Sequence, residues 1–253
     1  MIRQLARLVH AELLKVATIR STWGLVIAGI ALALVNLGVL LLLTAPSLDA
    51  DGLAQVASQP DAQALVLGTA SQGALFAMLI GVLASTGEIR HRTWSTTVLI
   101  TPRRWPVLVA KVKAMAIVGA LMALACLLVL EVVGQITFLG RMALNPGSAA
   151  LTILGTCLAF ALYCALGACL GALVRGQVPA IVIVLVGSFA LEPLVGVIWP
   201  DYATWLPGSA VSLVGSLGTV DTAVFLQGLA ALVAWVLVVG VSAGATSLRR
   251  DVT

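Results

Sequence analysis

Few residues in this chain are suited to chemistry, and two of them are carboxylates within apolar segments. Glu131 and Glu192 each lie in a long run of leucine, valine and other apolar residues. A carboxylate in such a run normally faces protein, water or a partner, because an apolar medium does not solvate its charge. Glu131 lies near the end of its run, where it can instead extend toward water. Pro193 follows Glu192 and disfavours regular helical geometry, so a kink with freed carbonyls is predicted there.

Metal and nucleotide chemistry lack the required residue spacing. The four cysteines all lie in apolar runs without a CxxC pair, and the two histidines are far apart among basic residues. This pattern predicts packing roles for the cysteines and no metal site. A nucleotide-binding P-loop needs lysine followed by serine or threonine, but the three lysines precede Val16, Val112 and Ala114. The chain is therefore predicted to be no enzyme and to hold no cofactor of its own.

The elements that position these residues are predicted to be membrane helices. Only 9% of the 253 residues are charged, against about 25% in a soluble domain, and mean hydropathy is +1.13. This composition excludes a soluble enzyme and a disordered chain. One crossing needs about 20 apolar residues, so we predict an all-α membrane protein that forms a single transmembrane domain. Its six spans are predicted at residues 23–43, 65–85, 114–136, 149–174, 179–199 and 224–245.

The basic residues predict the orientation of these spans. With six alternating crossings, every one of the 14 lysine and arginine residues except Arg141 falls on one side. The positive-inside rule assigns that side to the cytoplasm, so both termini are predicted to be cytoplasmic. The net charge of +4 then reflects topology in the cytoplasmic membrane and gives no reason to expect a nucleic-acid partner.

The segments outside the spans have different characters. Residues 1–20 predict an amphipathic helix at the membrane interface, with Glu12 and Leu14 as misfits; the alternative is an ordinary basic flank. The cytoplasmic loop 86–113 is predicted to hold a short helix over Trp94–Ile100. On the outer side, residues 44–64 show no clear structure. Residues 200–223 are either an interfacial hairpin or a re-entrant element, with Ser209 capping a helix over 210–217.

Several motifs, in this order along six spans, resemble the membrane (permease) subunit of an ATP-binding-cassette (ABC) transporter of the type-two exporter class. Residues 87–93 (Gly-Glu-Ile-Arg-His-Arg-Thr) resemble the stretch that closes the second span of that family. Residues 101–104 (Thr-Pro-Arg-Arg) and Ala110-Lys111 resemble the opening of its third span. Residues 171–181 and 191–194 (Leu-Glu-Pro-Leu) resemble its fourth-to-fifth junction and its fifth span.

The resemblance implies a function for the cytoplasmic loop. In that family the loop carries a coupling helix that docks on a separate ATPase subunit, which binds ATP and magnesium. The residues expected to couple this chain to such an ATPase are Glu88, Arg90, Arg92, Thr93, Trp94, Arg103 and Arg104. Arg92 departs from the family, which usually has glycine there. The alternative is that these arginines bind lipid phosphates and fix topology.

The leading hypothesis is therefore a permease subunit that exports a hydrophobic or amphipathic substrate. It would assemble with ABC ATPase subunits, a second copy or a related permease, and membrane lipid. Glu192, Pro193 and Glu131 become candidates for the translocation path or a helix hinge. An ATP-independent channel or secondary carrier is the alternative, and a non-transporting membrane anchor or sensor subunit is a third hypothesis.

Overall fold

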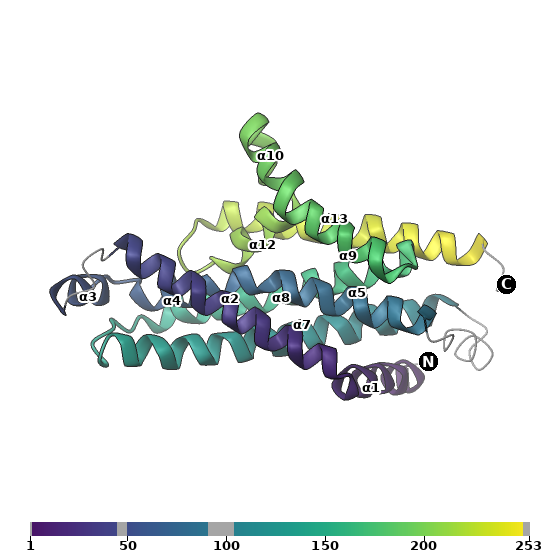
Figure 1. The fold of residues 1–253 in the computed structure, drawn as a ribbon, viewed down its shortest axis with the longest axis horizontal. Helices are drawn as coiled ribbons and strands as arrows, with labels where there is room; N and C mark the ends of the chain where they lie inside the picture. Colours follow the sequence, from purple (N-terminus) through teal and green to yellow (C-terminus); the bar gives the residue numbers. More distant parts are fainter. Residues whose placement is uncertain (1, 45–49, 91–103, 250–253) are drawn as a thin grey trace.

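The computed structural model describes residues 2–44, 50–90 and 104–249, and the regular structure in these ranges is entirely helical (Figure 1). In chain order the elements are α1 (Ile2–Thr18), α2 (Arg20–Thr44), α3 (Ala50–Ala57), α4 (Ala62–Gly68), the 3-10 turn η1 (Thr69–Gly73), α5 (Ala74–Arg90), α7 (Arg104–Thr137), α8 (Pro146–Val174), α9 (Gln177–Val186), the π turn η2 (Gly187–Leu191), α10 (Glu192–Ile198), α11 (Pro200–Ala203), α12 (Pro207–Gly215) and α13 (Thr222–Arg249).

Within the described ranges, six helical stretches are long and apolar enough to cross a membrane. They are Arg20–Thr44, Ala62–Gly87, Val107–Thr137, Pro146–Val174, Gln177–Ile198 and Thr222–Thr246. Each overlaps one of the spans expected from the sequence, so the prediction of six apolar helices is confirmed. The chain has the build of a multi-pass, all-α membrane protein.

Helix α7 begins at Arg104, before the span expected at residues 114–136, and Lys111 within it pairs with a carboxylate from another helix. One sequence expectation was wrong. Residues 44–64, expected to be irregular, contain α3 and the start of α4. Val56 is buried in the apolar core, and the Ala57 carbonyl accepts a hydrogen bond from the Ala143 N–H at 2.8 Å. These contacts hold α3 against the α7–α8 connection.

Helix α8 forms the centre of the bundle and packs against α5, α7, α12 and α13. Glycines make the closest approaches possible. A Cβ atom on Gly81 of α5 would collide with the Cys164 carbonyl of α8, and one on Gly167 of α8 would collide with the Met78 carbonyl of α5. Small residues at such positions let membrane helices pack backbone to backbone. The Gly167-xxx-Gly171 pair therefore serves packing within one chain.

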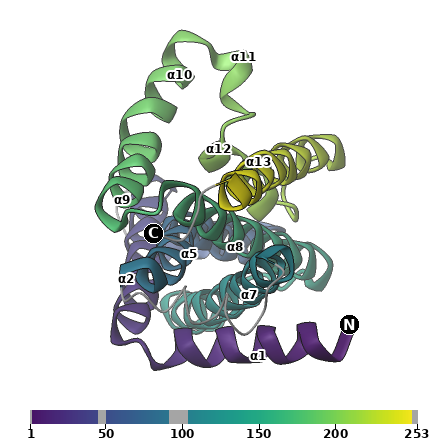
Figure 2. The same ribbon diagram turned by 90° about the vertical axis from the view of Figure 1, so that its right-hand side faces the viewer.

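Both ends of the described chain lie at the same end of the bundle, as expected for an even number of crossings. The N-terminal helix α1, the end of α13, the end of α5 and the start of α7 lie at one end of the bundle, with α3 at the other (Figure 1). Helix α1 lies across that end, whereas α10 leans away from the other helices (Figure 2). Most side chains of the fifth apolar helix are consequently exposed within this chain.

Candidate functional site

A partly open hollow of about 380 Å³ is lined by residues of α2, η1, α5, α8, η2, α10, α11 and α12. Its volume is within the range of about 300–1,000 Å³ that is typical of small-molecule sites. Its lining combines apolar side chains with hydroxyl, amide and carboxylate groups. The polar lining side chains are Ser71, Gln72, Tyr163, Ser188, Glu192, Ser209 and Ser212. A polar-lined hollow inside a bundle of apolar helices is the main candidate for a functional site.

Glu192 reaches this cavity from a distorted point of the fifth apolar helix. It is the first residue of α10 and directly follows the π turn η2. Pro193 has no N–H to donate to the preceding turn, and its ring crowds the carbonyl four residues earlier. A π turn widens the backbone at that point, and such turns recur at functional sites. The kink expected at Pro193 therefore takes the form of a π turn that ends just before Glu192.

The carboxylate of Glu192 is held at the N-terminus of α12. Its Oε1 atom accepts a hydrogen bond from the Gly208 N–H at 3.0 Å. The first N–H groups of a helix have no partner within the helix, and the helix dipole favours a negative charge there. A Cβ atom on Gly208 would collide with Glu192 Oε2. Glycine at position 208 thus lets the carboxylate lie directly against the backbone of α12.

The prediction that Ser209 caps a helix over residues 210–217 was wrong. Helix α12 begins at Pro207, and the residue at its N-cap position is Leu206, which supplies no side-chain hydrogen bond. The acceptor comes instead from Glu192, on another helix. Helix α12 packs inward against α8 and α13, and Val214 is completely buried. Residues 207–215 therefore belong to the packed part of the bundle.

The cavity carries a carboxylate but no cationic side chain among the residues described as lining it. The side-chain ion pairs described in the structure both belong to Glu12, on α1. Two aromatic rings contribute to the wall: Tyr163, which is buried, and Phe189, which is largely exposed. The arrangement can accept hydrogen bonds, donate them from hydroxyl groups, and balance a positive charge.

Glu131 lies away from this cavity and has amide partners of its own. Gln63 Nε2, from α4, donates to both of its carboxylate oxygens at 3.2 Å, and Gln135 Nε2, one turn later in α7, donates at 2.9 Å. Glu131 is half-buried and does not line the cavity. Its observed contacts form a hydrogen-bonded link between α4 and α7.

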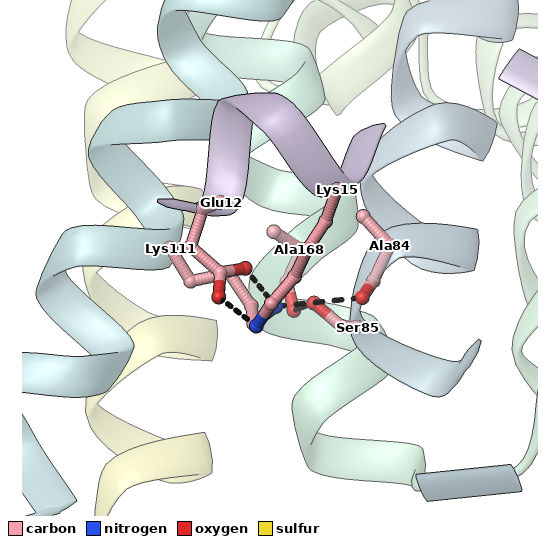
Figure 3. Close-up of polar contacts among 6 residues, drawn as sticks. All are labelled: Glu12, Lys15, Ala84, Ser85, Lys111 and Ala168. Carbon is pink, nitrogen blue, oxygen red and sulfur yellow. Dashed lines mark hydrogen bonds and ion pairs between the residues drawn. The ribbon is translucent and has the colours of Figure 1, made fainter. Parts of the chain in front are cut away.

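A second polar site, the Glu12–Lys111 clamp, joins α1 to α7 (Figure 3). We define it as Glu12, Lys15, Lys111 and the carbonyl of Ala84. Lys111 Nζ lies 2.5 Å from Glu12 Oε2 and 3.4 Å from the Ala84 oxygen, and Lys15 Nζ lies 2.6 Å from Glu12 Oε1. The side chains of Lys111 and Glu12 are only 3% and 8% exposed. The clamp is therefore a buried ion pair with a half-exposed second lysine at its edge.

The charge balance of the clamp favours ionised Glu12. Burial by itself raises the pKa of this carboxyl, but the attraction of Lys111 and hydrogen bonds from Lys111 and Lys15 outweigh it and lower the pKa. Sequence reasoning treated Glu12 as a misfit on the apolar face of α1. Its partner is 99 residues away in the sequence, so no local pattern could have identified the pair. The sequence signal for this ion pair was the presence of two opposite charges within otherwise apolar helix faces.

The expected coupling residues fall largely outside the described structure. Arg92, Thr93, Trp94 and Arg103 lie in residues 91–103, as does the helix expected over Trp94–Ile100. Glu88 and Arg90 belong to the last turn of α5, and Arg104 is the first residue of α7, but their side chains lie outside the description. The structure therefore places the two helices that flank this segment without testing its role.

Within residues 2–44, 50–90 and 104–249, no three histidine, cysteine, aspartate or glutamate side chains gather as a metal site would require. In comparisons with known proteins, no protein-family model and no curated protein matches this sequence.

Proposed function

We propose that this chain is the permease subunit of an ABC exporter that moves a hydrophobic or amphipathic substrate across the cytoplasmic membrane. The observation that carries the proposal is the cavity beside Glu192, a polar-lined hollow within a bundle of apolar helices. Transporters place substrate sites between helices that are irregular at that point. Here η1 and η2 interrupt two of the apolar helices, and residues of both line the cavity.

The energy source would be a separate ATPase subunit, because the sequence contains no P-loop. The proposed docking region is residues 86–113, with Glu88, Arg90, Arg92, Thr93, Trp94, Arg103 and Arg104 in contact with the ATPase. Support comes from the helices that flank this region. Helix α5 leads into it and lines the cavity with Ala74 and Leu75, and α7 leaves it through the Glu12–Lys111 clamp. A movement of the docking region would reach both the cavity and α1 through these two helices.

The proposal includes a membrane arrangement. Both termini and residues 86–113 would face the cytoplasm, as the distribution of lysine and arginine favours. Helix α1 would lie at the inner membrane surface, because Val16 and Glu12 face the bundle while Arg7 and His10 are exposed. The functional unit would contain two permease chains, identical or related, and two ATPase subunits.

Reconstitution tests this function. The tagged chain, purified from its native membrane, should bring with it a protein that carries a P-loop, as identified by mass spectrometry. In proteoliposomes, that partner's ATP hydrolysis should rise when the permease is present. Trp94→Ala or Glu88→Lys should abolish this stimulation, whereas Glu131→Gln, far from the docking region, should keep it. Full stimulation by the Trp94 and Glu88 variants would contradict the proposed docking region, and absence of an ATPase partner would contradict the function.

One observation favours the alternative of a secondary carrier. Carboxylates in membrane cavities often relay protons, and Glu192 is a carboxylate in such a cavity. A carrier would accumulate substrate in proteoliposomes under an imposed proton gradient without ATP, and Glu192→Gln would stop it. An ABC permease would show no such uptake, so this measurement separates the two functions.

A further inference from the structure

We propose that the cavity beside Glu192 binds the positively charged part of a lipophilic organic monocation, with Glu192 as its counter-charge. This inference deepens the proposed export function and rests on it for its physiological meaning. It names the class of substrate that the cavity would accept: a molecule with a single positive charge on a largely apolar body.

The first argument is the charge balance of the cavity. An ionised carboxylate among apolar helices is favoured when it is hydrogen-bonded and electrically compensated. The Gly208 N–H and the N-terminus of α12 supply a hydrogen bond and a partial positive charge. No lysine, arginine or histidine among the described lining residues supplies a full positive charge. A bound monocation would complete the compensation.

The ion pair of the Glu12–Lys111 clamp provides the comparison. Glu12, which is more deeply buried than Glu192, has Lys111 and Lys15 as fixed partners. Glu131 has two glutamine amides in direct contact. Glu192 differs from both, because the hydrogen bonds described for its carboxylate come from backbone N–H groups of α12, those of Gly208 and Ser209, and the carboxylate borders a cavity large enough for a ligand.

The second argument is the nature of the walls. The aromatic ring of Phe189 belongs to the π turn that precedes Glu192, and Tyr163 comes from the buried centre of α8. Aromatic faces attract organic cations through the charge distribution of the ring. Leu32, Leu75 and Val211 provide apolar surface for the remainder of the ligand. A carboxylate, two aromatic rings and apolar walls together favour a lipophilic cation over an anion or a sugar.

Tetraphenylphosphonium and tetraphenylborate, which have nearly the same shape and opposite charge, are the probes. Each is measured by equilibrium dialysis against the purified full-length chain in dodecyl maltoside, with detergent alone as the blank. The expected result is saturable binding of tetraphenylphosphonium that weakens at least about tenfold in Glu192→Gln, because the variant removes the Coulomb attraction of a close charge pair in a partly buried site. Tetraphenylborate should gain or keep affinity in the same variant.

Matched variants make the result specific. Glu131→Gln removes the same charge elsewhere in the bundle and should leave both affinities unchanged. In Glu192→Gln the side-chain carbonyl can still accept the hydrogen bond from the Gly208 N–H, so this variant is expected to fold. If it does not, Gly196→Val decides: a Cβ atom there meets only the Cβ of Ala203, at 4.0 Å, and the larger side chain narrows the cavity. Loss of tetraphenylphosphonium binding in that variant supports the inference.

Three results would overturn it: unchanged tetraphenylphosphonium affinity in Glu192→Gln, equal loss for both ions, or unchanged affinity in Gly196→Val. The assay uses the permease chain without an ATPase. Failure of charge-selective binding together with ATPase stimulation would therefore refute the substrate class and leave the export function standing. Charge-selective binding without any ATPase partner would support the substrate class and refute the ATP-driven export function.

Discussion

The Glu12–Lys111 clamp predicts a strong, non-additive response to mutation. Lys111→Met removes the cation, Glu12→Leu removes the carboxylate, and the double variant removes both. Because both side chains are more than nine-tenths buried, each single change leaves a buried charge without its main partner. Breaking a buried ion pair in this way costs about 3–5 kcal/mol, whereas replacing both partners by apolar residues of similar volume is often neutral.

The structure sets where each variant should fall in that range. Lys15 stays 2.6 Å from Glu12 when Lys111 is removed, so Lys111→Met should cost about 3 kcal/mol, the lower end. Glu12→Leu removes the carboxylate closest to the buried Lys111 ammonium and should cost about 3–5 kcal/mol. The double variant should cost less than the sum of the two single variants, since it removes both charges of the pair together.

Hydrogen–deuterium exchange of α1 in nanodiscs is the suitable assay, because local opening of a docked helix controls amide exchange. Each 1.4 kcal/mol of free energy changes the equilibrium constant for opening of α1 about tenfold. Lys111→Met should therefore speed amide exchange in α1 about 100-fold. Lys15→Ala is the matched control: its side chain is 45% exposed, and an exposed pair is worth under about 1 kcal/mol. Additive costs in the double variant, or a Lys15→Ala effect as large as Lys111→Met, would refute the reasoning.

Three further predictions follow from the described contacts. Undocking of α1 by acid should begin only below pH 4.5, the ordinary pKa of a glutamate. Because the pKa of Glu12 is lowered in the folded state, its stabilising effect is present above the ordinary pKa and is lost as the pH falls through the folded pKa. Amide exchange of α1 across a pH series, corrected for intrinsic exchange rates, measures this loss. Gly208→Ala should cost about 1–3 kcal/mol by forcing Glu192 off α12, seen as a lower thermal midpoint in detergent, whereas Gly196→Ala should be nearly silent. Gly81→Ala should prevent α5 from packing on α8 and abolish the monodisperse peak in size-exclusion chromatography, whereas Gly38→Ala, with open space around its Cβ, should leave it unchanged; normal behaviour of the Gly81 variant would contradict the close packing.

The six apolar helices could be predicted from the sequence because membrane insertion depends on the summed hydrophobicity of about 20 residues. The ion pair between Glu12 and Lys111 could not be predicted, because its two residues are far apart in sequence. Hydropathy reports composition within a window, whereas this pair depends on a tertiary contact.

Helix α3 was missed for a different reason. It is only 8 residues long, shorter than any isolated helix that is stable in water, so its sequence alone gives little helical preference. The spacing of Leu53, Val56 and Ala57 places them on one helical face. That pattern was a usable signal, but it becomes decisive only because Val56 and Ala57 are buried against the bundle.

The candidate site was predictable at Glu192 and Pro193 and unpredictable at their partners. A carboxylate and a proline within an apolar run stand out in any sequence. Gly208, in contrast, is one of 24 glycines, and its role depends on α12 returning to the bundle so that its N–H meets Glu192. The capping hypothesis for Ser209 failed because it considered only local acceptors, and the structure supplies the acceptor from the preceding apolar helix.

Three carboxylates in this chain meet the same physical problem, the cost of a charge among apolar side chains, in three ways. Glu12 is paired with two lysines, which suits a fixed joint between α1 and α7. Glu131 is held by two neutral amides, which joins α4 to α7 without needing a counter-charge. Glu192 has a backbone N–H on one side and a cavity on the other. Compensation by fixed side chains stabilises a fold and leaves nothing for a ligand to add. Of these three, only Glu192 leaves room for a ligand to supply compensation that the fold does not, and this is why function is assigned to that carboxylate.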